Sequence, residues 1–257
     1  MKPEKGVLIS ELSYEQCQDI VNEDTIVVLP IGGGSKEHGG HLPMGTDFYV
    51  TDWLARQVTE RYPVVTLPTL PYAYYPAFLN WKGSVHIEAS HFAAFVEDIL
   101  LSFVRHGVKK FLILDGGVST HIPLKIVSAT MCNKHGVHVG VSNCLGLGKE
   151  VDDALCEQPK GGHGDESETS TMLYIREDLV KMNETVEEYF EALPGCNKNG
   201  VNRVYLFSHA NSPRGCNGDS TLATREKGEK MLEAKVEDLL DFLKAFDSMN
   251  VSAGKPS

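Results

Sequence analysis

The sequence has no excess of basic residues, no closely paired cysteines and no long hydrophobic run. Its 24 Lys and Arg stand against 35 Asp and Glu, giving a formal net charge of −11. Such a surface repels phosphate backbones and anionic lipids, so we expect neither nucleic acid nor membrane as a partner. No apolar stretch approaches the roughly 20 residues of a membrane-spanning helix.

The six cysteines are scattered and form no CxxC pair. A thiolate zinc site needs closer spacing, and a chain of 257 residues can bury a core without disulfide bridges. The first residues contain no apolar segment typical of a secretory signal. We therefore expect a cytoplasmic protein with free thiols.

Short β-branched runs alternate with helical periods along most of the chain. Strands are predicted at Thr25–Pro30, Val64–Leu67, Gly83–Ile87, Lys110–Asp115, His138–Ser142 and Arg203–Phe207. Helices are predicted over about residues 48–61, 92–106, 123–135 and 223–248. This alternation predicts an α/β fold of three layers, a mostly parallel central sheet with helices on both faces. We expect one domain over residues 1–250 and a flexible tail over residues 251–257.

The densest group of potential metal ligands follows the first predicted strand. The segment GGGSKEHGGHLPMGTD, residues 32–47, contains Glu37, His38, His41 and Asp47. Carboxylate and imidazole groups together suit Zn²⁺ or Mn²⁺. Alternatively, Asp47 caps the following helix, the histidines are solvated, and Lys36 pairs with Glu37 at the surface.

A second acidic group lies at residues 161–170, GGHGDESETS. Its carboxylates repel one another unless water or a cation neutralises them. The alternative is an acidic loop that leads into a helix, whose first turn favours Glu. A third segment, DGGVST at residues 115–120, follows the clearest strand and could form an anion-binding turn. Ligands bind at the carboxyl ends of strands in open α/β sheets, so the loops after Pro30, Asp115 and Ser142 can converge there.

Together these segments resemble the creatininase (creatinine amidohydrolase) family. The family's first motif is close to P-[ILV]-G-S-x-E-Q-H-G-P-H-L-P-L-G-T-D, and residues 30–47 read PIGGGSKEHGGHLPMGTD. The family's H-A-G-E-x-E-T-S corresponds to HGDESETS at residues 163–170, and its N-G-H-G-G-N to the DGGVST segment. A last motif, G-D-P-x-x-A-T-x-x-K-G, corresponds to GDSTLATREKG at residues 218–228.

The resemblance implies a hydrolase that acts on a small cyclic amide or related cyclic carbonyl compound through a divalent metal. Zn²⁺ is the first expectation, with Mn²⁺ or Fe²⁺ as alternatives. The matched positions imply that Glu37, His38, Asp47 and Glu168 hold the metal. They also imply that His163 and Glu166 form the acid–base pair.

Two departures from the family pattern bear on the metal. Lys36 stands where the family has its first Glu, so Glu37 can serve as a ligand only if the loop kinks. Gly117 replaces the His of N-G-H, which removes one imidazole. We expect one firmly held ion, with a weakly held second ion as the alternative, and His121 or Asp115 as possible compensation for the missing ligand.

The sequence does not identify the substrate. Tyr75, Trp81 and Ser119 are predicted to line its pocket, the alternative being ordinary buried aromatic residues. The family also includes members that act on carbocyclic diketones in polyol breakdown, and a non-catalytic metabolite-binding protein with a decayed metal site is a further alternative. Related proteins form rings of dimers, so we expect a homo-oligomer, a hexamer by resemblance.

Overall fold

The computed structural model describes residues 2–189, 197–198, 201–202 and 212–250. Its centre is a five-stranded parallel sheet in the order β1-β3-β2-β4-β5. The strands are β1 (Val7–Leu8), β2 (Ile26–Ile31), β3 (Val65–Thr66), β4 (Lys110–Asp115) and β5 (His138–Val141). In the central pair, Ile26 lies opposite Lys110 and Ile31 opposite Asp115. Both strands are buried along their whole length, as expected of a sheet covered on both faces.

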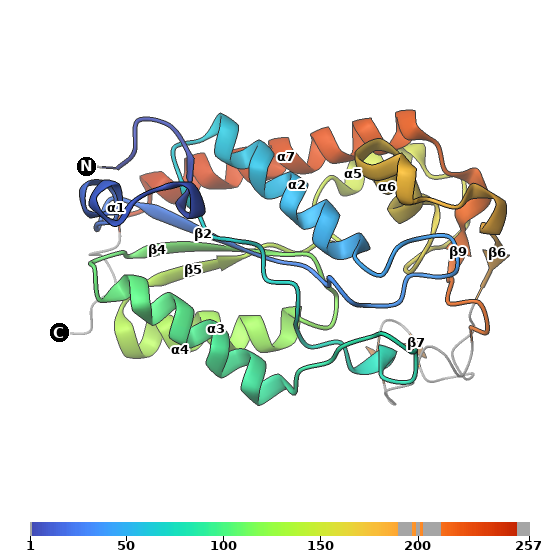
Figure 1. Ribbon diagram of the computed structural model, residues 1–257, viewed down its shortest axis with the longest axis horizontal. Coiled ribbons are helices and arrows are strands. Elements are labelled where there is room, and N and C mark those ends of the chain that lie inside the picture. Colours follow the sequence, from blue (N-terminus) through green and yellow to red (C-terminus); the bar gives the residue numbers. More distant parts are fainter. Residues whose placement is uncertain (1, 190–196, 199–200, 203–211, 251–257) are drawn as a thin grey trace.

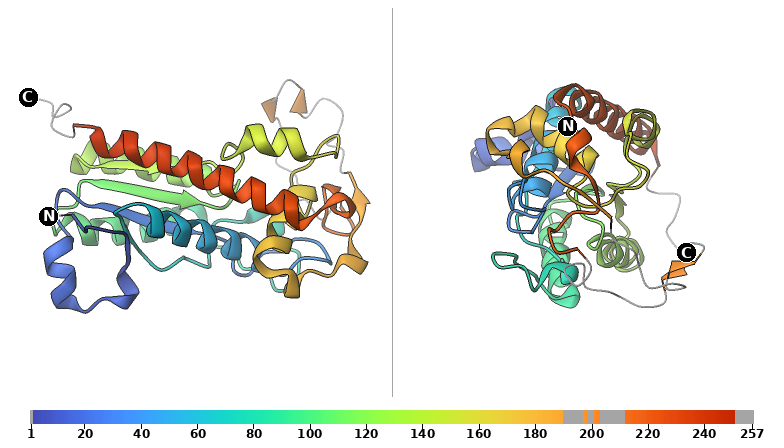
Figure 2. Two further views of the ribbon diagram at one scale, coloured as in Figure 1. Left: turned by 90° about the horizontal axis from the view of Figure 1, so that it is seen from above. Right: turned by 90° about the vertical axis from the view of Figure 1, so that its right-hand side faces the viewer.

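Helices cover the two faces of the sheet, so the molecule has three layers (Figure 1). One face carries α2 (Thr46–Arg61) and α7 (Arg225–Ser248), and the other carries α3 (Ala89–Val104) and α4 (His121–His135). Successive side chains of a strand point to opposite faces. Accordingly Val27 and Leu29 pack with α3 and α4, whereas Ile26 and Val28 pack with α2 and α7. Helix α7 runs almost the length of the molecule (Figure 2).

Shorter elements gather near the carboxyl edge of the sheet and at its ends. They are α1 (Tyr14–Ile20), α5 (Lys149–Leu155), α6 (Glu166–Arg176), β6 (Glu187–Glu188), β7 (Asn197–Lys198), β8 (Val201–Asn202), β9 (Gly218–Asp219), and 3₁₀ turns at Ile9–Glu11, Pro76–Phe78, Glu177–Leu179, Met182–Glu184 and Ser220–Leu222. Strand β6 pairs with β9, and β7 with β8, both antiparallel. Helix α6 packs between α2 and α7. No helix in the described ranges is long and apolar enough to cross a membrane.

The predicted α/β class and layer arrangement are confirmed, and the four predicted helices and four of the strands lie within a few residues of their expected bounds. The strand predicted at Gly83–Ile87 is wrong, because this segment is an irregular connection. Its Val85 and Ile87 amides donate to the carbonyls of Ser35 and Ala73 instead of joining the sheet. The predicted strand at Arg203–Phe207 and the tail at residues 251–257 lie outside the described residues. The five described cysteines are free, as expected.

Candidate metal centre and pocket

One pocket lies where the segment after β2, the end of β4 and the first turns of α2 and α6 meet. This is the carboxyl edge of the sheet, the usual ligand position in such folds. The pocket has a volume of about 840 Å³, which suits a small molecule.

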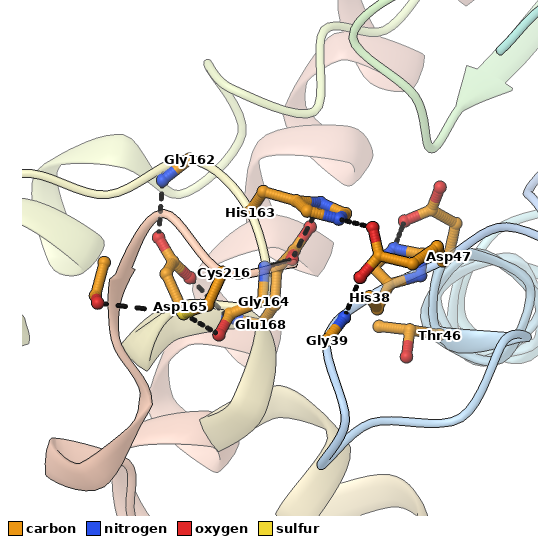
Figure 3. A network of polar contacts seen from close by, with 12 residues as sticks. His38, Gly39, Thr46, Asp47, Gly162, His163, Gly164, Asp165, Glu168 and Cys216 are labelled. Atoms are coloured by element: carbon orange, nitrogen blue, oxygen red, sulfur yellow. Dashed lines mark hydrogen bonds and ion pairs between the residues drawn. The ribbon is translucent and has the colours of Figure 1, made fainter. Parts of the chain in front are cut away.

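Three side chains in this region can together hold a metal ion: His38, His163 and Glu168. Each offers one ligand atom, and the three atoms lie within 4.8 Å of one another. His38 comes from the loop after β2, His163 from the loop before α6, and Glu168 from the first turn of α6 (Figure 3). The Asp165 side chain caps α6 by accepting the amides of Ser167 and Glu168, which fixes the turn that presents Glu168.

Both ring nitrogens of His38 face oxygen atoms. Its Nδ1 lies 2.9 Å from the Lys36 carbonyl oxygen, and its Nε2 lies 2.7 Å from Asp47 Oδ1. A neutral imidazole can donate from only one nitrogen, so the other would turn a lone pair toward an oxygen. A proton or a metal cation at Nε2 removes this repulsion. The backbone contact at Nδ1 is the usual support of a metal-binding histidine.

His163 is held in a similar way by Glu37. Its Nε2 lies 3.1 Å from Glu37 Oε2, and its Nδ1 lies 3.9 Å from Glu168 Oε2. The other oxygen of Glu37 accepts the amide of Gly39, whose φ of +79° lies in the left-handed region that favours glycine. Glu37 therefore supports His163 from behind and leaves Nδ1 facing the three-residue group.

Lys36 lies inside the site and not at the surface. Its Nζ is 2.7 Å from Asp47 Oδ2, and both side chains are buried. The alternative of a surface pair between Lys36 and Glu37 is therefore wrong. Burial alone would raise the pKa of Asp47, but the neighbouring Lys36 ammonium and His38 hold it well below its usual range. Asp47 is thus a carboxylate shared between Lys36 and His38.

In two other acids of the pocket wall, the effect of burial on the pKa outweighs that of neighbouring charges and hydrogen bonds. Removal from bulk water raises the pKa of Glu168 to about 7, against the opposing effects of His163 and Lys36. Burial likewise raises the pKa of Asp115 to about 7, although its Oδ1 accepts the Thr120 hydroxyl and the Gly117 amide. Its Oδ2 has no hydrogen bond within the described part of the chain, but it lies 3.4 Å from Nδ1 of His121. Carboxylates outnumber ammonium groups here, so the site can accommodate a further cation.

Of the predicted metal ligands, His38 and Glu168 lie in the three-residue group, Asp47 adjoins His38, and Glu37 contacts His163. Glu166 does not reach this group. Its Oε2 accepts the amides of Glu157 and Gln158, each at 2.9 Å, and its Oε1 lies 2.5 Å from Lys227 Nζ. This location corrects the predicted pairing of Glu166 with His163 and gives Glu166 a structural role.

Two of the three predicted substrate-binding residues line the pocket, and the third does not. Tyr75 and Ser119 line the pocket, and the Tyr75 hydroxyl is buried without a hydrogen bond to any described residue. Trp81 does not line it and packs against the hydrophobic cluster between the sheet and α3. His41 lies deeper, with Nε2 bonded to the Thr169 hydroxyl, and burial lowers its pKa to about 4.

Sequence reasoning gave too little weight to Asp115 and Lys36. A carboxylate that ends a fully buried strand at the carboxyl edge was a signal for Asp115. Lys36 stands in the middle of the ligand-rich segment, but no pattern in the sequence indicates which carboxylate it contacts.

Comparisons with known proteins extend these observations. The creatininase family model, described as creatinine amidohydrolase, matches residues 10–243. Creatinine amidohydrolase of Pseudomonas putida is 24% identical over 93% of this chain and 97% of its own length. The 3-dehydro-scyllo-inosose hydrolase of Thermotoga maritima is 23% identical over 95% of this chain and 83% of its own length. A mycofactocin precursor peptide peptidase of Mycobacterium tuberculosis is 25% identical over 90% of this chain and 89% of its length.

Solved structures show the same fold. A crystal structure of creatinine amidohydrolase superposes with a TM-score of 0.82 at 23% identity, covering 96% of this chain and all of the other. Related structures are described as a Mn creatininase and as a Zn-Zn type of a creatininase mutant. The relatives are thus hydrolases, and metal-bound forms of this fold are known.

Proposed function

Because the chain belongs to the creatininase family, we propose that it is a metal-dependent hydrolase of a small cyclic amide or related cyclic carbonyl compound. The observation that carries this proposal is the convergence of His38, His163 and Glu168 beside the pocket, which His163 and Glu168 line. Two histidines and one glutamate form a ligand set of catalytic zinc sites, which leave a fourth position open. Zn²⁺ is therefore proposed first, with Mn²⁺ or Fe²⁺ as alternatives.

The ion would polarise the scissile carbonyl and lower the pKa of a water molecule bound to it. The chain's own residues supply the remaining requirements. Glu37 accepts a hydrogen bond from His163 Nε2–H and so orients the ring, and Lys36 keeps Asp47 ionised beside His38. His163 is proposed as a ligand here, because its Nδ1 faces the metal-binding group.

Asp115 is proposed to carry the transferred proton in place of Glu166. A carboxyl group whose pKa is about 7 can both hold and release a proton near neutral pH. Asp115 lines the pocket, and its Oδ2, which lies 3.4 Å from His121 Nδ1, can donate there to a leaving nitrogen or oxygen. The buried Tyr75 hydroxyl and Ser119 are proposed to bind polar groups of the substrate.

The test is metal analysis of protein purified without chelator. We expect near-stoichiometric Zn, Mn or Fe, and loss of the ion in His38→Ala, His163→Ala and Glu168→Gln. The matched control is Glu166→Gln, two residues earlier on α6, which should keep its metal. Failure to bind any of these ions, with no thermal shift on adding them, would refute the metal centre.

The substrate class is tested by screening cyclic amides, lactams and cyclic diketones with the loaded enzyme. The diketone arm is included because a relative at 23% identity is an inosose hydrolase. Turnover of a cyclic amide supports the first proposal, and turnover of a diketone alone supports the alternative. Saturable binding without turnover across the screen would favour a metabolite-binding protein.

A further inference from the structure

The Lys36 ammonium occupies a buried position on Asp47. The exposed fractions of the two side chains are only 8% and 5%, and Nζ lies 2.7 Å from Oδ2. The faces of two aromatic rings enclose the ammonium, with ring centres at 5.2 Å for Tyr75 and 4.9 Å for Phe78. A cation held between a carboxylate and two aromatic faces is fixed in place.

Asp47 uses its two oxygens for two different neighbours. Oδ1 lies 2.7 Å from His38 Nε2, on the side of the proposed ion, and Oδ2 faces Lys36. A carboxylate that bridges two metal ions would place one oxygen on each. In this protein the second oxygen already faces a positive charge, so an ion there would meet the ammonium at close range.

Gly117 offers no side-chain ligand at the position where the family has a histidine. A Cβ at Gly117 would lie 2.5 Å from Thr120 Oγ1 and 3.0 Å from the Tyr75 ring, so no larger side chain fits without a shift. Within the described ranges, His38, His163 and Glu168 form the one group of three potential ligands.

We propose that Lys36 is a built-in cation that takes the place of a second metal ion on Asp47, so that each chain binds a single divalent ion. This inference rests on the proposed function for the first ion. The ammonium lines the pocket beside that ion and supplies one positive charge that cannot dissociate. The centre is therefore expected to need one ion where a two-metal site needs two.

The experiment counts ions per chain after chelator treatment, by calorimetric titration with Zn²⁺ or Mn²⁺ and by native mass spectrometry. Wild-type protein should bind one ion. Lys36→Glu removes the ammonium and adds a carboxylate, so it should bind two. Lys36→Met removes only the charge, and the first ion should bind at least about tenfold more tightly because a nearby repulsion is lost.

The matched control is Lys235→Met. Lys235 also lines the pocket and forms a shielded pair with Asp152 at 2.5 Å, away from the metal-binding group. Its loss should leave the number and affinity of ions unchanged. Thermal unfolding confirms that each variant is folded, and Lys36→Met serves if Lys36→Glu does not fold.

The outcomes separate the two proposals. No ion in any variant would overturn the proposed function and this inference with it. Two ions in wild-type protein, one ion in folded Lys36→Glu, or unchanged affinity in Lys36→Met would overturn only the role of Lys36.

Discussion

Asp115 is a buried acid whose ionisation opposes folding. Its carboxyl is 1% exposed, and burial raises its pKa from 3.8 to about 7. Between these values the folded protein keeps a proton that the unfolded chain has released. Stability contributed by the protonated group is therefore full below about pH 4, falls as pH rises, and is lost above about pH 7.

Asp115→Asn should remove this pH dependence, because the amide keeps an acceptor for the Thr120 hydroxyl and the Gly117 amide but does not ionise. In metal-free protein, the variant should gain about 2–4 kcal/mol of unfolding free energy over wild type at pH 8, with the difference shrinking toward pH 4. Urea unfolding at several pH values measures this. Parallel pH profiles for the two proteins would contradict the raised pKa.

At the scale of elements, the contact between α6 and α7 positions Glu168. Gly228 of α7 lies against the backbone of α6, and a Cβ there would overlap the Ser170 carbonyl oxygen. The Ser170 hydroxyl in turn accepts the amide of Thr224 at the start of α7. The glycine of the last sequence motif therefore allows two helices to approach closely.

Gly228→Ala should lower the unfolding free energy by about 1–3 kcal/mol, because the helices must separate. At an exposed helical position, the same Gly→Ala change would raise the unfolding free energy by about 1 kcal/mol. The ion affinity should fall as well, since α6 carries Glu168. Denaturant unfolding and metal titration measure both effects, with Glu229→Ala at an exposed neighbouring site as control. A stabilised variant with normal ion affinity would show that the contact does not matter.

At the scale of the whole molecule, an apolar stripe on α4 stays exposed on the outer surface of its layer. Ile122 and Ile126 are 70% and 61% exposed, and they lie one helical turn apart. Exposed apolar residues in such a row are typical of contact surfaces between chains. We therefore place the predicted homo-oligomer contact at this stripe.

Light scattering at micromolar concentration should give a mass several times that of one chain, with a hexamer as the expected state. Ile122→Asp combined with Ile126→Asp should lower the mass, because charges would be buried at the contact. As a control, Tyr14→Ser changes an exposed aromatic residue of α1 and should leave the measured mass unchanged. A strictly monomeric wild-type protein would contradict the assembly but not the fold.

Local patterns in the sequence were sufficient to predict the three-layer arrangement and to locate most of the segments that carry potential metal ligands. The spacing of hydrophobic residues along the chain predicts the buried strand Lys110–Asp115 and the amphipathic helix α7. This spacing depends only on residues that are near in sequence. The position of His38 and Asp115 at one edge follows from the rule that parallel strands end together, since each lies at or just after the end of a buried strand.

Only the tertiary structure decided which side chains meet. Glu166 and Glu168 are two positions apart, and a helix turns by about 200° over two residues, so they face opposite sides. Glu168 joins the metal-binding group, whereas Glu166 meets Lys227. Lys36 likewise contacts Asp47 and not its neighbour Glu37, because adjacent residues of the kinked loop point apart. Such choices depend on contacts between segments distant in sequence, which composition and period do not encode.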